Sequence, residues 1–225
     1  MNILELFAGS RCIGREAERQ GHNVFSVDWT NYENIDLVAD IGILKKEDVP
    51  FIPDVVWASP DCTTYSIAAC GTHRNTDCTP KSDYAIKCDE VNQHWISLIK
   101  EWLTINPNLI FFIENPRGNL RNMKWMKEFD RTTVWYCKYG DSRAKPTDIW
   151  TNHLHSIFNP KGWIPRSECS NYKYDKDGNI INRHCQHESS QRGSRTGTQG
   201  IKGSYERSKI PQQLCEEIIK SIKKS

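Results

Sequence analysis

The sequence predicts an α/β domain with a largely parallel sheet, and three observations support this. Short apolar runs of strand length alternate with segments of helical periodicity through residues 1–115. The runs are continuously apolar, as in strands that are buried on both faces of a sheet. Residues that end helices, such as Gly21 and Pro107, separate the segments. These features indicate a Rossmann-like domain, in which helices cover both faces of the sheet.

The individual elements follow in chain order. The apolar runs predict strands at residues 2–6, 23–28, 54–58 and 108–114. Helical spacing predicts helices at residues 13–20 and 86–105, the second with Trp95 and Trp102 on its core-facing side. Further strands are expected at residues 133–139 and 147–151, and a last helix at residues 211–222. Within residues 169–185 we expect a hairpin that reverses at Asp177-Gly178.

Composition limits the class of protein. The chain has 225 residues, enough for one domain with a sizeable core, and 30 Lys and Arg balance 28 Asp and Glu. The start of the chain lacks the pattern of a secretory signal, and no apolar run approaches the ~20 residues of a membrane helix. We therefore expect a soluble, cytoplasmic protein without membrane contact. Its 9 cysteines, an odd number, are then expected to be reduced thiols or ligands.

The turn after the first strand is a candidate cofactor site. Phe7-Ala8-Gly9 follows that strand, and Asp28 ends the second strand with Trp29 beside it. Ligands of doubly wound sheets bind at this edge, where an acidic residue can hold ribose hydroxyls. The spacing G-x-G-x-x-G is missing, which disfavours a dinucleotide and favours an adenosine cofactor without phosphate. Alternatively, Asp28 simply caps the next turn.

Cys62 and Glu114 are the candidate catalytic pair. Each lies at the carboxyl end of its own predicted strand, so both should face one crevice. A cysteine nucleophile in a protease would need a histidine base, whereas a cysteine with a carboxyl group suits attack on an aromatic ring. The alternative for Cys62 taken alone is a buried structural thiol.

Seven motifs, in order, carry a resemblance to a known family. The first five motifs are LFAGSRCIG, VDW, ADI, SPDC and FFIENP. The last two are YGDSRAKPTDIWTN and RSKIPQQLCEEII. With these motifs the chain resembles the DNA cytosine-5 methyltransferases over nearly its whole length, and most closely their short, phage-type members.

The resemblance implies a reaction and its residues. Cys62 would attack C6 of a cytosine, and Glu114 would hydrogen-bond the amino group and N3 of the base. Asn115 would orient the loop, and Arg143 would support the carboxylate and the base. Activated C5 would then take a methyl group from S-adenosylmethionine. The residues implied in binding this cofactor are Phe7, Ala8, Gly9, Asp28, Trp29, Asp40 and Pro60.

The implied cofactor contacts have a definite arrangement. Asp28 would bind the ribose, Trp29 would pack on the adenine, and Asp40 would accept from the adenine amino group. Two departures bear on the site. Asp61 precedes the nucleophile where the family has proline, and it should raise the thiol pKa unless it is paired. Ser10-Arg11 replaces the usual glycine beside the methionine tail.

The resemblance also suggests how the chain is divided. Residues 1–150 would form the cofactor-binding and catalytic core, residues 151–204 a reduced recognition region with the hairpin and a basic, glycine-rich loop, and residues 205–225 a segment that returns to the core. The substrate would be a cytosine flipped out of DNA. Phosphate contacts are expected from Arg183, Arg192, Arg195 and Lys202.

Several alternatives stay open. The small recognition region leaves RNA possible as a substrate, and a non-catalytic cofactor- or nucleic-acid-binding relative is the rival from another class. Zinc at Cys169, His184, Cys185 and His187 is disfavoured, because the paired C-x2-C spacing is missing, so we expect no metal. The loop after Cys62 is expected to close over the flipped base. We expect a monomer, in a bacterial or phage-infected cell.

Overall fold

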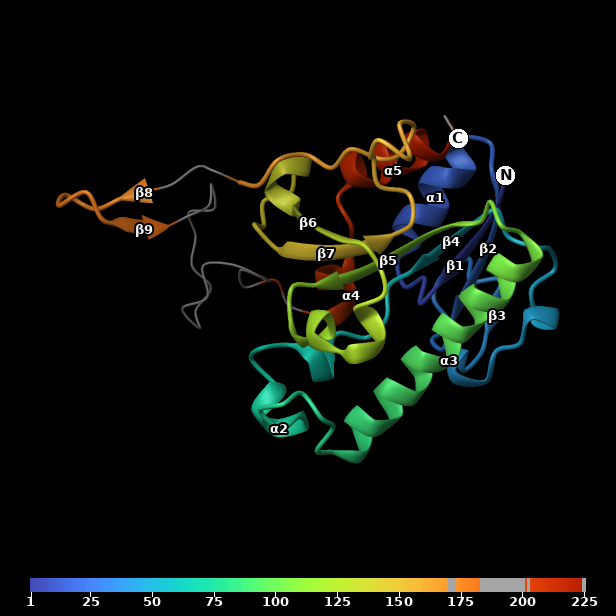
Figure 1. Cartoon of the computed structure of the whole chain (residues 1–225), viewed down its shortest axis with the longest axis horizontal. Helices are drawn as coiled ribbons and strands as arrows, with labels where there is room; N and C mark the ends of the chain where they lie inside the picture. The colour runs from blue at the N-terminus through green and yellow to red at the C-terminus, as the bar shows by residue number, and fades with distance from the viewer. Residues whose placement is uncertain (170–172, 183–200, 202, 224–225) are drawn as a thin grey trace.

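A seven-stranded mixed sheet forms the centre of the computed structural model, which describes residues 1–169, 173–182, 201 and 203–223 (Figure 1). The strand order is β3-β2-β1-β4-β5-β7-β6. The strands are β1 (Asn2–Leu6), β2 (Asn23–Asp28), β3 (Leu37–Val38), β4 (Val55–Ala58), β5 (Ile110–Pro116), β6 (Arg131–Trp135) and β7 (Pro146–Thr151). A separate hairpin pairs β8 (Lys173–Tyr174) with β9 (Ile180–Asn182) and has its turn at the predicted Asp177-Gly178.

Strand direction divides the sheet. The pairs β1–β2, β2–β3, β1–β4 and β4–β5 are all parallel, whereas β7 runs antiparallel to both β5 and β6. The chain builds outward from β1 through β2 to β3 on one side, and through β4 to β5 on the other. The order therefore reverses between β1 and β4, and in open α/β sheets such a reversal creates a crevice at the carboxyl ends of the strands.

Helices cover both faces of the sheet, as predicted. On one face, α3 (Asp83–Ile105) packs Trp95 and Trp102 against Leu4 and Val56. On the other face, α1 (Cys12–Arg19) and α5 (Gln212–Ile222) lie side by side (Figure 1). Successive strand residues point to opposite faces of a sheet. The chain neighbours Ile3 and Val55 therefore belong to a second apolar cluster, formed with α1 and α5 on the other face. This accounts for the continuously apolar strands.

One predicted strand is shorter than expected. Residues 133–139 were expected as one strand, but β6 ends at Trp135 and residues Tyr136–Tyr139 form a 3-10 turn. In a 3-10 turn residues i and i+3 lie on the same side, and Tyr136 and Tyr139 are both buried in the second cluster. Two short helices, α2 (Cys70–His73) and α4 (Ser204–Ser208), were not predicted. Among the described residues, no helix has the length and apolarity that membrane crossing requires.

Asp148 in β7 holds the antiparallel part of the sheet together. Its side chain is fully buried and binds two guanidinium groups, those of Arg121 and Arg131, with Arg131 Nη1 at 3.0 Å. Thr133 donates to the same carboxylate at 2.7 Å. A buried charge of this kind is stable only while its partners remain.

We expect the substitution Asp148→Asn to lower the free energy of unfolding by about 3 kcal/mol, because two cations then lose their counter-charge. Urea denaturation followed by circular dichroism measures this. The matched control is Asp130→Asn, which changes an exposed aspartate just before β6 and should leave stability unaltered. Equal midpoints for the two variants would contradict the assigned role of Asp148.

Candidate active site at the carboxyl ends of the strands

The turn after β1 has an unusual backbone. Phe7, Gly9 and Arg11 have φ angles of 54°, 50° and 53°, in the left-handed region. Only glycine adopts this region without steric cost, so two of the three positions are strained. The Phe7 ring is fixed by an edge-on contact with Trp95, with 6.1 Å between ring centroids. Strain held in place by packing is typical of functional turns.

Glu5 lies beneath this turn and was not identified from the sequence. Its carboxylate is 2% exposed and accepts hydrogen bonds from the Gly14 amide and the Ser26 hydroxyl, both at 3.0 Å. Ser26 in turn accepts from Arg11 Nε at 2.8 Å. A Cβ atom on Gly14 would lie 2.3 Å from Glu5, so the first turn of α1 needs glycine there. The signal that could have found Glu5 is an acidic residue inside an apolar run.

Asp28 joins the ends of β1 and β2. It is 5% exposed, and its two oxygens accept from the Gly9 amide at 2.9 Å and the Thr30 amide at 2.8 Å. Burial raises the pKa of this carboxyl, and the backbone hydrogen bonds oppose that effect. Asp28 therefore does cap the next turn. Each carboxylate oxygen can accept a second hydrogen bond, so a ribose hydroxyl could still bind. Trp29 beside it is 56% exposed.

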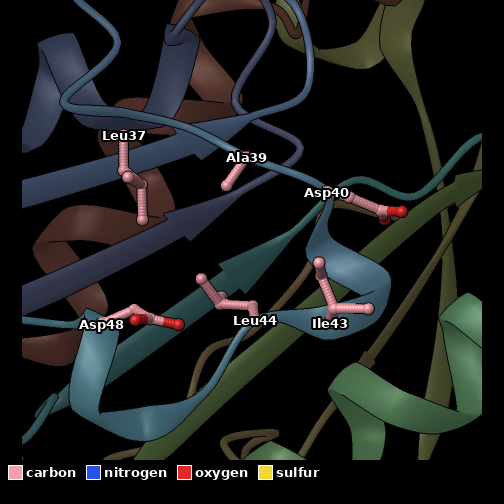
Figure 2. A pocket seen from close by; sticks show the side chains of 6 residues that line it. All are labelled: Leu37, Ala39, Asp40, Ile43, Leu44 and Asp48. Carbon is pink, nitrogen blue, oxygen red and sulfur yellow. The ribbon is translucent and has the colours of Figure 1, made fainter.

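Asp40 follows β3 and borders a small cavity of about 250 Å³. Figure 2 shows Leu37, Ala39 and Leu44 pointing towards the same space, while the carboxylate of Asp40 points away from it. Asp40 accepts from the Gly42 amide at 2.8 Å. The cavity is mostly apolar, and Asp40 is its only lining residue among those predicted to bind the cofactor.

The turn after β4 presents Cys62. Asn115, fully buried at the end of β5, donates through Nδ2 to the Pro60 carbonyl at 2.9 Å. Its Oδ1 atom is buried and has no hydrogen-bond partner among the described residues. This contact fixes the turn to the strand that carries Glu114. Cys62 itself is partly exposed.

Asp61, which stands beside Cys62 where proline was expected, is paired. It accepts from the amide and hydroxyl of Thr63, at 2.9 and 2.7 Å, and from the hydroxyl of Tyr84 on α3. The pairing turns the carboxylate towards α3 but leaves an electrostatic effect. Burial raises the pKa of the Cys62 thiol to about 11, Asp61 and Glu114 add to the increase, and Lys145 opposes it.

Lys145 is a buried cation whose charge acts on Cys62, and it was not predicted from the sequence. The antiparallel pairing of β7 with β5 sets Asp148 opposite Asn115 and so brings residue 145 near the end of β5. Lys145 is 6% exposed, donates to the Arg207 carbonyl at 3.0 Å, and lies 4.7 Å from the Tyr136 ring centre. Burial lowers its pKa and the charge of Glu114 opposes this. The sequence does contain a signal for Lys145, because it is a second cation two residues after Arg143 in the motif DSRAK.

Arg143 is directed elsewhere. It binds the Asp141 carboxylate through Nε and Nη2, and it donates to the carbonyls of Arg207 and Lys209, both at 3.0 Å. Glu114 instead accepts from the Tyr136 hydroxyl at 3.0 Å. Arg143 therefore holds the closing segment of the chain, residues 203–223, onto the site. Its predicted support of the base stays a prediction.

The closing segment, residues 203–223, returns to the turn after β1. The Ile210 amide donates to Cys12 Sγ at 3.4 Å, and Gln212 donates to Glu16 at 2.7 Å. In α4, Tyr205 packs against Tyr32, with 5.2 Å between ring centroids. The segment thus joins the candidate cofactor turn to the end of the sheet that carries Cys62 and Glu114.

Some predicted residues lie outside the described part of the chain. They are His184, Cys185 and His187 of the zinc alternative, and the phosphate-binding candidates Arg183, Arg192, Arg195 and Lys202. Within the described residues, no three His, Cys, Asp or Glu side chains gather in a way that could hold a metal ion.

Comparison with known proteins identifies a relative by sequence and solved structures with a similar fold. No family model matches the chain. A Frog virus 3 (isolate Goorha) protein named "Probable DNA (cytosine-5)-methyltransferase" is 29% identical over 177 residues, 76% of this chain and 78% of the relative. The solved methyltransferase EhMeth of Entamoeba histolytica has a TM-score of 0.54 and 15% identity, covering 96% of this chain and 81% of its own.

A second solved structure, a Spodoptera frugiperda DNMT2 mutant, matches 67% of this chain with 17% identity and a TM-score of 0.45. This chain spans about half, 49%, of its length. The likeness to EhMeth confirms the predicted Rossmann-like methyltransferase fold. The viral relative confirms the predicted resemblance to the DNA cytosine-5 methyltransferases.

The raised pKa of Glu5 predicts a pH-dependent stability. Burial raises this pKa from 4.5 to about 7. Between these values the unfolded chain has lost the proton that the folded chain keeps, so stability falls as pH rises. Relative to Glu5→Gln, the wild type should lose roughly 3 kcal/mol at most across this window. Urea denaturation of both proteins at pH 4.5 and 7.5 measures the difference; a constant difference would refute the assignment.

The charges around Cys62 predict its reactivity. Because only the thiolate reacts, alkylation of Cys62 by iodoacetamide should rise about tenfold per pH unit up to a pH near 11. At a fixed pH of 8.5, Asp61→Asn should speed the reaction and Lys145→Met should slow it, each several-fold, because these residues shift the thiol pKa in opposite directions. Mass spectrometry of the Cys62 peptide gives the rates. Identical rates in both variants would show that neither charge acts on the thiol.

Proposed function

We propose that this protein transfers a methyl group from S-adenosylmethionine to C5 of a cytosine in DNA, through a covalent bond between Cys62 and C6. The observation that carries the proposal is the position of Cys62, in the turn after β4, and of Glu114, on the neighbouring strand β5, at the edge of the sheet where the strand order reverses. The candidate cofactor turn, at the end of β1, lies on the other side of β4. The similarity to the viral relative supports the same reaction.

The residues at the end of β1 and β2 fit an adenosine cofactor without phosphate. Asp28 retains hydrogen-bonding capacity for a ribose, and exposed Trp29 offers an apolar face for a base. Phe7, Ala8 and Gly9 would form the floor, with Asp40 and Pro60 at the sides. When bound here, S-adenosylmethionine supplies the methyl group that C5 receives.

The chain's own residues would prepare the cytosine. Cys62 gives up its proton to water, and its sulfur then adds to C6, so that the electron pair of the C5–C6 double bond moves towards C5. Lys145 favours the thiolate because its positive charge lowers the pKa of Cys62. Glu114 hydrogen-bonds the amino group and N3 of the base while negative charge builds in the ring, and the Tyr136 hydroxyl orients this carboxyl. Once C5 carries the methyl group, a water molecule takes the C5 proton, the C5–C6 double bond re-forms, and the bond from C6 to Cys62 breaks.

Asn115 would serve the reaction by holding the nucleophile turn. Its hydrogen bond to the Pro60 carbonyl joins the turn to β5, so Cys62 and Glu114 are fixed relative to each other. All these groups come from one chain, so a monomer is sufficient for the chemistry. The target base must leave the duplex stack, at a cost of a few kcal/mol.

Covalent trapping tests the proposal. A DNA duplex with 5-fluorocytosine in mixed contexts is incubated with the protein and S-adenosylmethionine, and adducts are measured by mass spectrometry. Fluorine at C5 blocks the final elimination, so we expect a methylated adduct on Cys62. The variant Glu114→Gln should form it on the order of 100-fold more slowly, because it cannot serve as the proton-handling carboxyl.

Two controls make the result decisive. Cys62→Ala should form no adduct, and a matched RNA carrying 5-fluorocytosine tests the alternative substrate. An adduct on RNA alone would correct the substrate class. No adduct on either nucleic acid, from protein that still binds cofactor, would refute the catalytic proposal and favour a binding protein.

A further inference from the structure

Arg74 lies in the segment that follows the nucleophile, and its side chain is fully buried. All five of its N–H groups have acceptors. Nε donates to the Thr64 carbonyl at 3.0 Å, and Nη2 donates to Thr64 Oγ1 at 2.9 Å and Asp89 Oδ1 at 2.8 Å. Nη1 donates to the Cys78 carbonyl at 3.2 Å and Asp89 Oδ2 at 3.1 Å. One side chain thus joins the start and the end of this segment to α3.

The acceptor Asp89 belongs to a buried polar network on α3. It also accepts from the Tyr65 hydroxyl at 2.6 Å, and Asn92 donates to that hydroxyl at 2.8 Å. The Arg74 guanidinium lies 4.1 Å from the Tyr65 ring centre. Burial by itself lowers the pKa of Arg74, but the hydrogen bonds to Asp89 outweigh it and the pKa is raised, so the charge is kept. A buried network of this kind is rigid, because breaking any member strands a polar group.

The network reaches Cys62 through Thr64 and Tyr65. The Tyr65 amide donates to the Cys62 carbonyl at 3.1 Å, which closes the turn that carries the nucleophile. On the opposite side, a Cβ atom on Gly118 would lie 2.5 Å from the Tyr65 carbonyl oxygen, so the chain after β5 lies directly against this turn. Together with the Asn115–Pro60 hydrogen bond, these contacts hold the nucleophile turn from both ends.

We propose that Arg74 is a positioning residue for Cys62. The inference rests on the proposed function, because the group to be positioned is the nucleophile. Arg74 is placed to act through Thr64 and Tyr65 and touches no reacting atom. A displacement of about 1 Å at a nucleophile can slow a reaction about 100-fold.

The test compares Arg74→Lys with Arg166→Lys. Lysine keeps the charge but cannot reproduce the planar set of five donors. Arg166 is a matched control, because it also binds a carboxylate, an amide oxygen and a backbone carbonyl, those of Glu217, Gln213 and Lys138. With saturating 5-fluorocytosine DNA and cofactor, we expect Arg74→Lys to form the Cys62 adduct about 100-fold more slowly, and Arg166→Lys within twofold of wild type. The cofactor Kd should stay within twofold in both.

A wild-type adduct rate in folded Arg74→Lys would overturn the proposal. So would a slow rate accompanied by weaker cofactor binding, since that would indicate general loss of structure. If Arg74→Lys does not fold, Asp89→Asn replaces it, with the same expected slowing.

Wild type without any adduct would refute the proposed function, and hydrogen exchange of the backbone amides then tests the role of Arg74 by itself. Amides of residues 62–66 should exchange about tenfold faster in the variant and those of residues 212–222 equally; unchanged exchange at 62–66 overturns the proposal.

Discussion

The antiparallel pairing of β7 with β5 is the constraint on which the site depends. It sends the chain back along β5, so the residues just before β7 lie past the end of β5, at the edge of the sheet that carries Glu114. Lys145 thereby enters the site, and Arg143 reaches the carbonyls of the closing segment. A parallel strand at this place would have put the same residues at the opposite edge of the sheet. One reversal of direction therefore supplies both a cation near Cys62 and an anchor for the last segment of the chain.

Burial gives these charges their effect. Glu114 and Lys145 are 5% and 6% exposed, so water screens their interaction with Cys62 only weakly. Such groups are stable because each has a partner: Glu114 the Tyr136 hydroxyl, and Lys145 the Arg207 carbonyl and the Tyr136 ring. Tyr136 contacts both, and it is buried because a 3-10 turn follows β6. The local turn thus organises the electrostatics of the site.

The sequence predicted those elements and site residues that depend on local patterns. Continuous apolar runs located the central strands, and the end of each strand located Cys62 and Glu114. It did not predict Lys145 or the Arg74–Asp89 pair, because these depend on how distant segments meet. Tyr136 was assigned to a strand, since two aromatic residues three apart suit a strand end as well as a turn. Glu5 was missed because an acidic residue in an apolar strand has no local explanation.

The burial of Cys62 beside the charge of Asp61 has a consequence for the redox chemistry of its thiol. Oxidation of cysteine to sulfenic acid proceeds through the thiolate, and so does disulfide exchange with small thiols. With a thiol pKa of about 11, Cys62 is almost entirely protonated at neutral pH. Burial and the charge of Asp61 therefore slow its reaction with peroxide and glutathione.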